Sequence, residues 1–362
     1  MKNIQNILIN NFETKIISSG ENYPKININN NNLKSLCILL HCRISLAEIK
    51  DYFGWDDIKL FNRIRLLLNE DLIIKVKDTY VPNFMIITLN EGKQLYNQLL
   101  NIDIEVADLI ISSLSEIKQQ ALSLKCFKQF NFEDISLLVL SNIILDAVQI
   151  DYVESLFLSS KRTIRNTMNY YYSIQEKDPS SEVEAFRIYG NMIKSYGTVE
   201  LGVYGNKRNG INFHNLNQSQ LTKWFNINNH RDVLSNKSYL LEQLLKYYSY
   251  NTYEISEQNI NGFNKLGIMN DKSISIPILS QQQFTLWYDI AKIITADLIK
   301  ILNKNKAMIY NNYSKSVYVN EISFNEYFIW WYHLLYSKIT DILVEKRVVK
   351  IPKEGVASYI VY

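Results

Sequence analysis

The feature that most constrains the fold of this chain is a change of hydrophobic period at Leu72. From Leu33 to Leu68, apolar residues recur at the three- and four-residue spacing of amphipathic helices, and polar breaks divide this stretch into three segments. From Leu72 to Leu89, short apolar runs typical of β-strands replace that spacing. The sequence therefore predicts three helices followed by a β-hairpin, and then a further helix from Leu89 to Gln98.

Local capping signals predict where these helices begin and end. Ser45 precedes a helical run and is followed three residues later by Glu48, which is the signature of a capping box, and Gly54 ends the same helix. Asp56 or Asp57 can cap the third helix. The apolar stripe of this third helix is expected at Ile58, Phe61, Ile64, Arg65 and Leu68.

This order of elements resembles a winged helix-turn-helix domain, and the resemblance covers residues 33–98, under a fifth of the chain. The segment from Thr88 to Lys93 also resembles the segment that leaves the wing in many bacterial regulators. The resemblance implies that the third helix lies in the major groove of duplex DNA and that the hairpin, or wing, contacts phosphates. It also implies a two-fold homodimer, which doubles the DNA site.

Six residues are the predicted DNA contacts. Arg and Asn side chains form paired hydrogen bonds with guanine and adenine edges, and Lys can contact phosphates. On the third helix, the candidates lie off the apolar stripe or adjoin it: Lys59, Asn62, Arg63 and Arg65. On the first wing strand, Lys75 and Lys77 alternate and are expected to point to one face, before a turn at Asp78–Thr79.

A competing hypothesis is that the winged helix docks a protein partner. Four acidic residues near the third helix dilute its positive field, namely Asp56, Asp57, Glu70 and Asp71, and the net charge of the chain is only +3. An exposed apolar patch on the third helix would favour this hypothesis. An enzyme whose site is built from residues far apart in sequence is a third alternative.

The fold class predicted for the whole chain is mainly α with small β elements. Residues 1–32 are expected to form an N-terminal arm and Asn-rich linker, 99–169 a helical region, 170–210 a small antiparallel sheet, and 211–362 a helical region ending in a β-hairpin. The strands of that hairpin are expected at Arg347–Ile351 and Ala357–Val361. A second winged helix built on this terminal hairpin is an alternative that the sequence leaves open.

Two further groups of residues are candidate binding sites. Lys161, Arg162 and Arg165 precede three tyrosines, a combination typical of single-stranded nucleic-acid grooves, although a solvated connection into a strand also explains it. Tyr189 and Tyr204 each precede a Gly-Asn pair and, with Tyr171, are predicted to line a ligand or partner site. Tight turns alone also account for the Gly-Asn pairs.

Motifs of metal, cofactor or catalytic chemistry are missing from the sequence. Cys37, His41 and Cys42 share one helical segment, but structural zinc needs four ligands and no second cysteine pair follows. The chain contains no glycine-rich phosphate loop, no G-x-S-x-G and no H-E-x-x-H. We therefore expect no cofactor, no metal and no catalytic residue.

The expected compartment is the cytoplasm. The three cysteines do not suggest a disulfide framework, and no run of about 20 apolar residues predicts a membrane-spanning helix. Taken with the resemblance, these features predict a DNA-binding transcriptional regulator whose larger C-terminal body senses an effector or mediates dimerisation.

Overall fold

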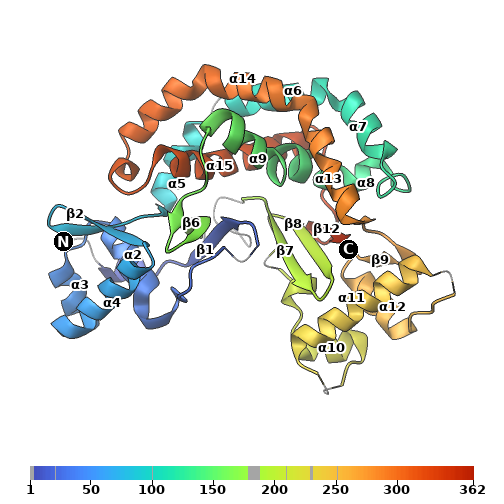
Figure 1. Cartoon of the computed structure of the whole chain (residues 1–362), viewed down its shortest axis with the longest axis horizontal. Helices are drawn as coiled ribbons and strands as arrows, with labels where there is room; N and C mark the ends of the chain where they lie inside the picture. Colours follow the sequence, from blue (N-terminus) through green and yellow to red (C-terminus); the bar gives the residue numbers. More distant parts are fainter. Residues whose placement is uncertain are drawn as a thin grey trace. The chain divides into compact units, whose positions relative to one another are not determined.

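A computed structural model describes residues 4–20, 22–99, 101–177, 188–208, 210–228, 231–250 and 252–362 (Figure 1). Helices make up 55% of the structure and strands 16%. The predicted fold class, mainly α with small β elements, is therefore confirmed. The chain divides into two compact units, each built from three separate stretches of sequence.

Unit 1 comprises residues 1–100, 153–186 and 301–335. Its elements are α1 (Ile4–Leu8), β1 (Phe12–Ser18), the 3-10 helix η1 (Asn30–Asn32), α2 (Leu33–His41), α3 (Leu46–Phe53), α4 (Asp57–Asn69), β2 (Ile73–Val76), β3 (Thr79–Pro82), β4 (Met85–Ile87), α5 (Leu89–Asn97), the π-helix η3 (Val153–Leu158), β5 (Ile164–Arg165), β6 (Met168–Glu176), the 3-10 helix η6 (Val317–Asn320), and the parts of α14 (Trp287–Ser314) and α15 (Phe324–Glu345) in this range.

The three helices and the hairpin predicted near the N-terminus are present, and we call α2–α4 with β2 and β3 the first module. The predicted capping box of α3 is confirmed, because the Ser45 side chain accepts from the Glu48 amide and Glu48 reaches back to Ser45. Gly54 ends α3 in the left-handed conformation, and Asp56 caps α4. Leu36 and Leu67 are fully buried, and such burial typically stabilises by about 1.5–3 kcal/mol per side chain.

Unit 1 also contains a small sheet, whose strand β4 directly follows the first module in the chain. Strand β6 is central, with β1 antiparallel on one side and β4 parallel on the other. Strand β4 follows the β2–β3 hairpin directly, and Thr88 then caps α5 in a capping box with Glu91. The order is thus one strand, three helices, a hairpin, a second strand and a capped helix.

Unit 2 comprises residues 101–152, 187–300 and 336–362. Its elements are α6 (Ile102–Ser112), α7 (Leu114–Ser123), α8 (Phe132–Ser136), the π-helix η2 (Leu137–Asp146), α9 (Gln149–Tyr152), β7 (Gly190–Tyr196), β8 (Val199–Gly205), the 3-10 helix η5 (Phe213–Asn215), α10 (Gln218–Phe225), α11 (Val233–Ser249), α12 (Glu257–Lys265), β9 (Met269–Asn270), β10 (Ser273–Ile274), β11 (Ile278–Leu279), α13 (Gln281–Thr285), β12 (Val356–Val361), and the remaining parts of α14 and α15.

Unit 2 repeats the topology of unit 1. Helices α10–α12 with the hairpin β9–β10 form a second module, coloured yellow in Figure 1. Strand β12 is antiparallel to β8, which precedes the module, and parallel to β11, which follows its hairpin. In unit 1, β6 is likewise antiparallel to β1, which precedes the first module, and parallel to β4, which follows its hairpin. Strand β11 also leads into a capped helix, with Ser280 and Gln283 in place of Thr88 and Glu91.

The repeat extends to single backbone hydrogen bonds at the corner after the third helix. Asp71 and Gly267 occupy this corner with φ values of 52° and 67°. In the first copy, the Leu72 amide donates to the Leu67 carbonyl at 2.9 Å, and the Leu72 carbonyl accepts from the Asn83 amide, just after the hairpin, at 2.9 Å. In the second copy, the Ile268 amide donates to the Phe263 carbonyl at 3.0 Å, and the Ile268 carbonyl accepts from the Ser275 amide at 2.9 Å.

The two hairpin turns correspond as well. Each has two residues between its closing strand pair, and the first of them is left-handed, with φ of 54° at Lys77 and 51° at Asp271. The chain therefore contains two copies of one supersecondary unit. The repeat lies at residues 218–274 and not on the expected terminal hairpin, where the sequence left a second winged helix open as an alternative.

Two predicted β elements are wrong, the first of them in part. The sheet expected at 170–210 forms only in part: β7 and β8 pair antiparallel in the sheet of unit 2, whereas β6 belongs to the sheet of unit 1. Residues 178–187 lie outside the described residues. The terminal hairpin is absent, since 347–351 forms no strand and β12 pairs with β8 and β11. At β6 and at β12, pairing with strands far away in the sequence replaces the local pairing expected between neighbouring runs.

One helical segment, Phe132–Leu158, is long and apolar enough to cross a membrane, contrary to the expectation from sequence. Within its most apolar window, 83% is buried in the protein. That burial is typical of a core helix in a soluble protein.

Candidate functional site

The outward face of α4 differs from the predicted one. The residues that face the core are Leu60, Ile64 and Leu67, whereas Ile58 and Phe61 are 73% and 62% exposed. Two apolar lines run along this helix, and periodicity alone does not indicate which one is buried. The predicted stripe is thus correct at Ile64 and wrong at Ile58, Phe61 and Arg65, which are exposed.

The predicted DNA contacts on α4 fall into two groups. Asn62 and Arg65 lie on the outward face beside Phe61, with the Arg65 guanidinium 6.0 Å from the Phe61 ring centre. Lys59 is also exposed, with its ammonium 4.0 Å from Asp56. These three side chains are accessible to a ligand.

Arg63 has a structural environment. Its guanidinium stacks 4.2 Å from the ring centre of Trp55, and it donates to the carbonyls of Asn31 at 2.9 Å and Lys59 at 3.0 Å. These contacts hold η1 against α4. Arg63 therefore has a structural role in unit 1.

On the β2–β3 hairpin, Lys75 is exposed in β2, opposite Tyr80. Lys77 is exposed as well, but it lies in the turn rather than on the strand, because β2 ends at Val76. The expected alternation of two lysines along one strand is therefore wrong. Both ammonium groups still belong to the same hairpin, one on the strand and one at its tip.

Part of the acidic charge near α4 has partners in unit 1. Asp57 pairs with Lys50 at 2.9 Å. Glu70 is buried and accepts at 2.8 Å from the side chain of Asn166, whose backbone amide donates to Asp71 at 2.9 Å. The Lys50 ammonium offsets the charge of Asp57, whereas the neutral amides of Asn166 leave the charges of Glu70 and Asp71 in place.

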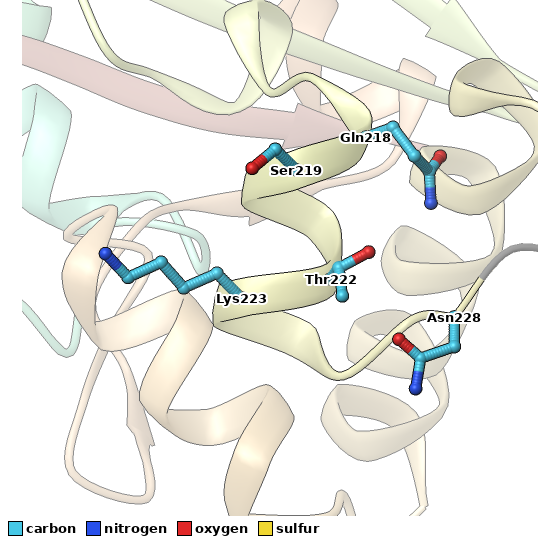
Figure 2. A pocket seen from close by; sticks show the side chains of 5 residues that line it. All are labelled: Gln218, Ser219, Thr222, Lys223 and Asn228. Atoms are coloured by element: carbon cyan, nitrogen blue, oxygen red, sulfur yellow. The ribbon is translucent and has the colours of Figure 1, made fainter.

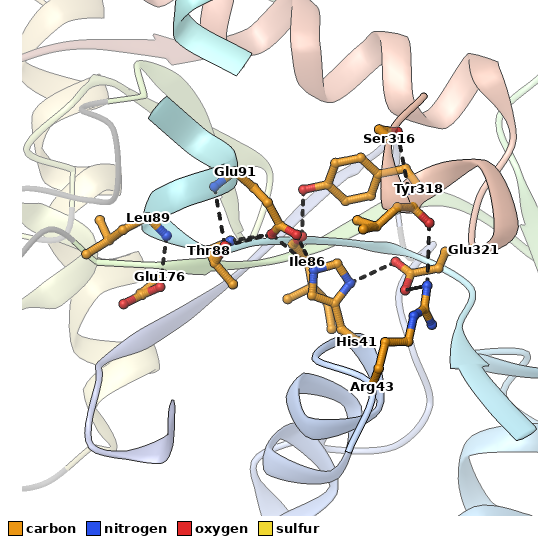
Figure 3. Close-up of polar contacts among 11 residues, drawn as sticks. His41, Arg43, Ile86, Thr88, Leu89, Glu91, Glu176, Ser316, Tyr318 and Glu321 are labelled. Carbon is orange, nitrogen blue, oxygen red and sulfur yellow. Dashed lines mark hydrogen bonds and ion pairs between the residues drawn. The ribbon is translucent and has the colours of Figure 1, made fainter. Parts of the chain in front are cut away.

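A buried charged cluster lies at the end of α2, within the same unit (Figure 3). Nδ1 of His41 is 2.8 Å from Glu321, and Nε2 is 2.9 Å from Glu91. Arg43 also pairs with Glu321, at 2.9 Å. Tyr318 stacks on the His41 ring and donates to the carbonyl of Ile86 at 2.9 Å. The cluster joins α2 to α5 and to η6.

The electrostatics of this cluster favour a charged imidazole. Burial alone would lower the pKa of His41, but the hydrogen bonds to Glu321 and Glu91 and the attraction of both carboxylates raise it to about 9. For Glu91, burial would raise the pKa, but the contacts with His41 and Thr88 lower it. His41 is therefore protonated at neutral pH, so it is a structural cation rather than a general base.

Metal binding at Cys37, His41 and Cys42 has no geometric support in the described residues, where no group of three or more His, Cys, Asp or Glu could hold an ion. Cys37 is buried in the module core, and the pKa of its thiol is raised by burial. The His41 ring nitrogens face carboxylates.

The second basic group is dispersed by the fold. Arg165 is fully buried, where it donates to the carbonyls of Asn83 and Tyr170 and pairs with Glu326. Arg162 forms a two-pronged pair with Glu154 at 2.9 and 3.2 Å. Lys161 is exposed. Arg165 is thus not accessible to a nucleic acid, which corrects the expectation for that residue.

The three predicted tyrosines belong to different units. Tyr171 lies in β6 of unit 1, where it is fully buried. In unit 2, the rings of Tyr189 and Tyr204 stack with centres 6.3 Å apart. Their hydroxyls engage Asp341 at 3.1 Å and Ser141 at 2.6 Å. The structure therefore brings two of these tyrosines together, in a buried setting.

Among the hollows of unit 2 are two that adjoin the second module. One, of about 440 Å³, lies along α10 and is lined by Gln218, Ser219, Thr222, Lys223 and Asn228 (Figure 2). These side chains supply amides, hydroxyls and one ammonium, without a carboxylate or imidazole for acid–base catalysis. The other, of about 620 Å³, adjoins the β9–β10 hairpin and includes the Lys350–Asp134 pair.

Comparisons with protein-family models, with curated proteins and with solved structures give no match to this chain.

Proposed function

We propose that this chain is a DNA-binding transcriptional regulator of the winged-helix type, which contacts duplex DNA through α4 and the β2–β3 wing. The observation that carries the proposal is the outward face of α4, where a guanidinium, an amide and an ammonium lie beside a hairpin with two exposed lysines. Such side chains combine base contacts from the helix with phosphate contacts from the wing.

The internal repeat supports the same proposal. A single chain carries two modules with the same order of elements, and each ends in a short hairpin. DNA-binding proteins commonly use two reading elements on one site, because the second element adds both affinity and specificity. We propose that the second module is a further contact element, and that the homodimer implied by the resemblance would present four modules.

The test is a titration of the full chain against mixed-sequence duplex DNA at 50 and 200 mM salt. Affinity should fall steeply with salt, because bound lysines and arginines release counterions from the phosphates. Replacing Lys75 and Lys77 by Ala should reduce the slope of log affinity against log salt by about 2. Lys300→Ala is the control, since Lys300 is an exposed lysine on α14, 77% accessible and outside both modules.

An absence of binding at low salt, or binding that does not respond to salt, would contradict the proposal. The second candidate function, docking of a protein partner, is favoured by the exposure of Ile58 and Phe61. It predicts that Phe61→Ala abolishes partner binding while the lysine substitutions have little effect. For a regulator of this kind, we propose a cytoplasmic location.

A further inference from the structure

We propose that α4 reads thymine in the major groove, through contacts of Ile58 and Phe61 with the 5-methyl groups of the bases. This inference rests on the proposed function, since it names the bases that the same face recognises. It also explains why two large apolar side chains are held outward on a helix whose opposite face already fills the module core.

The apolar side chains occupy the N-terminal half of α4. Ile58 is the second residue of the helix and Phe61 lies one turn further, at 73% and 62% exposure. In helix-turn-helix proteins, this part of the recognition helix contacts base edges. The only apolar group that a base pair presents in the major groove is the thymine methyl, and aromatic and aliphatic side chains contact it.

Asn62 completes the set for an A·T pair. On α4, Asn62 is one turn beyond Ile58 and on the same face. The helical rise separates them by about 6 Å, close to two base-pair steps. An Asn amide forms paired hydrogen bonds with the N6 and N7 positions of adenine. Its present contact with Arg65, at 3.4 Å, is long enough to be exchanged for such a pair.

The charge around this apolar pair favours DNA over a protein as the occupant. Arg65 lies over the Phe61 ring, Lys59 is exposed one position after Ile58, and the wing adds Lys75. Two exposed carboxylates, Asp56 and Asp57, precede Ile58, but Asp57 pairs with Lys50 at 2.9 Å, so the cations around the apolar pair outnumber the carboxylates. The centre of a protein interface is depleted of charged residues. A helix that enters a groove between two rows of phosphates is instead flanked by cations.

The experiment uses the full chain and a pool of random-sequence DNA duplexes. Bound duplexes are recovered, and one recovered sequence is then synthesised twice, with thymine and with deoxyuridine. Deoxyuridine pairs in the same way but lacks the 5-methyl group. Affinity for the deoxyuridine duplex should be lower by about fourfold for each thymine methyl group that α4 touches, while the salt dependence should stay unchanged.

Substitutions assign the effect to α4. Ile58→Ala and Phe61→Ala should bind the thymine duplex more weakly and should discriminate less between the two duplexes. Both side chains are exposed, so circular dichroism should show an unchanged fold. Ile104→Ala is the matched control, because Ile104 is 51% exposed on α6 and lies outside both modules, and this variant should keep the full discrimination.

The remaining outcomes separate thymine reading, its assignment to α4 and the proposed function. Salt-dependent binding with equal affinity for the two duplexes would refute thymine reading and leave the proposed function intact. Discrimination that persists in Ile58→Ala and Phe61→Ala would refute the assignment to α4, because the methyl groups would then act elsewhere or through DNA shape. No binding to any duplex at low salt would refute the proposed function itself.

Discussion

The buried charged cluster at His41 supports a quantitative prediction. Replacing His41 by Gln keeps a hydrogen-bonding side chain but removes the positive charge between Glu91 and Glu321, the latter 0% exposed. A pKa raised from 6.5 to about 9 corresponds to about 3 kcal/mol of preference for the folded state. That value agrees with the usual cost, about 3–5 kcal/mol, of removing one partner of a buried ion pair. We therefore expect the free energy of unfolding of His41→Gln to fall by about 3 kcal/mol at pH 6–7.

The pH dependence follows from the directions of the two shifts. The folded pKa of His41 is raised, so its contribution is complete below pH 6.5 and is lost as the pH rises through about 9. The folded pKa of Glu91 is lowered, so its contribution is present above pH 4.5 and is lost on acidification. The wild-type protein should therefore lose stability between pH 7 and 10, and the variant should lack this part of the loss.

The assay is urea denaturation at pH 6.5, 8 and 10, followed by circular dichroism, with hydrogen exchange of residues 33–41 as a local readout. His214→Gln is the matched control. That imidazole is buried too, and burial lowers its pKa to about 4, so it is neutral across this pH range. The His214→Gln substitution should lower the free energy of unfolding by a similar amount at every pH above 7, so the pH dependence should stay that of the wild type. The reasoning would be refuted if the free energy of unfolding of His41→Gln fell with pH as steeply as that of the wild type. A loss of unfolding free energy under about 1 kcal/mol would refute it too.

Two further predictions test the cores of the units. Gly202→Ala should destabilise by about 1–3 kcal/mol, because a methyl group there would lie about 2.1 Å from the Tyr359 ring, and thermal unfolding of the variant measures the loss. Stability equal to that of the wild type would contradict this packing. Glu326→Gln leaves the Arg165 guanidinium buried without its carboxylate and should cost about 3–5 kcal/mol in urea denaturation, whereas a cost near zero would mean that the pair is dispensable.

The local structure of the first module could be predicted from the sequence because its signals are local. A cap such as Ser45 with Glu48, or a helix end such as Gly54, depends on residues within one turn. The orientation of α4 depends on distant residues, since the helix offers two apolar lines and its neighbours in the core determine which one is buried. The predicted stripe was wrong at Ile58 and Phe61 for this reason.

The charged cluster could not be found in the sequence. Its members are 50 and 280 residues apart, so their meeting depends on the complete fold of unit 1. His41 was considered only with its neighbours Cys37 and Cys42, because sequence spacing shows only partners on the same helix. No sequence pattern links His41 to Glu91 or Glu321, because both carboxylates lie far from it along the chain.

The second module did have a sequence signal. In both copies, two apolar residues of the strand after the hairpin are followed directly by a capping box, with Thr88 and Glu91 in one copy and Ser280 and Gln283 in the other. The signal is short and the two hairpins differ in length, so the copies do not align over a long stretch. Their correspondence becomes clear only from strand pairing and backbone hydrogen bonds.

The duplication also bears on how the chain folds. Each copy runs from a first strand, through a module, to a last strand, and a helical stretch precedes that last strand. The compact units do not coincide with the copies: unit 2 includes residues 101–152 of the first copy, and unit 1 includes residues 301–335 of the second. Each core therefore needs residues from both halves of the chain. Deleting either copy would therefore remove part of both cores, so we expect the two modules to unfold together.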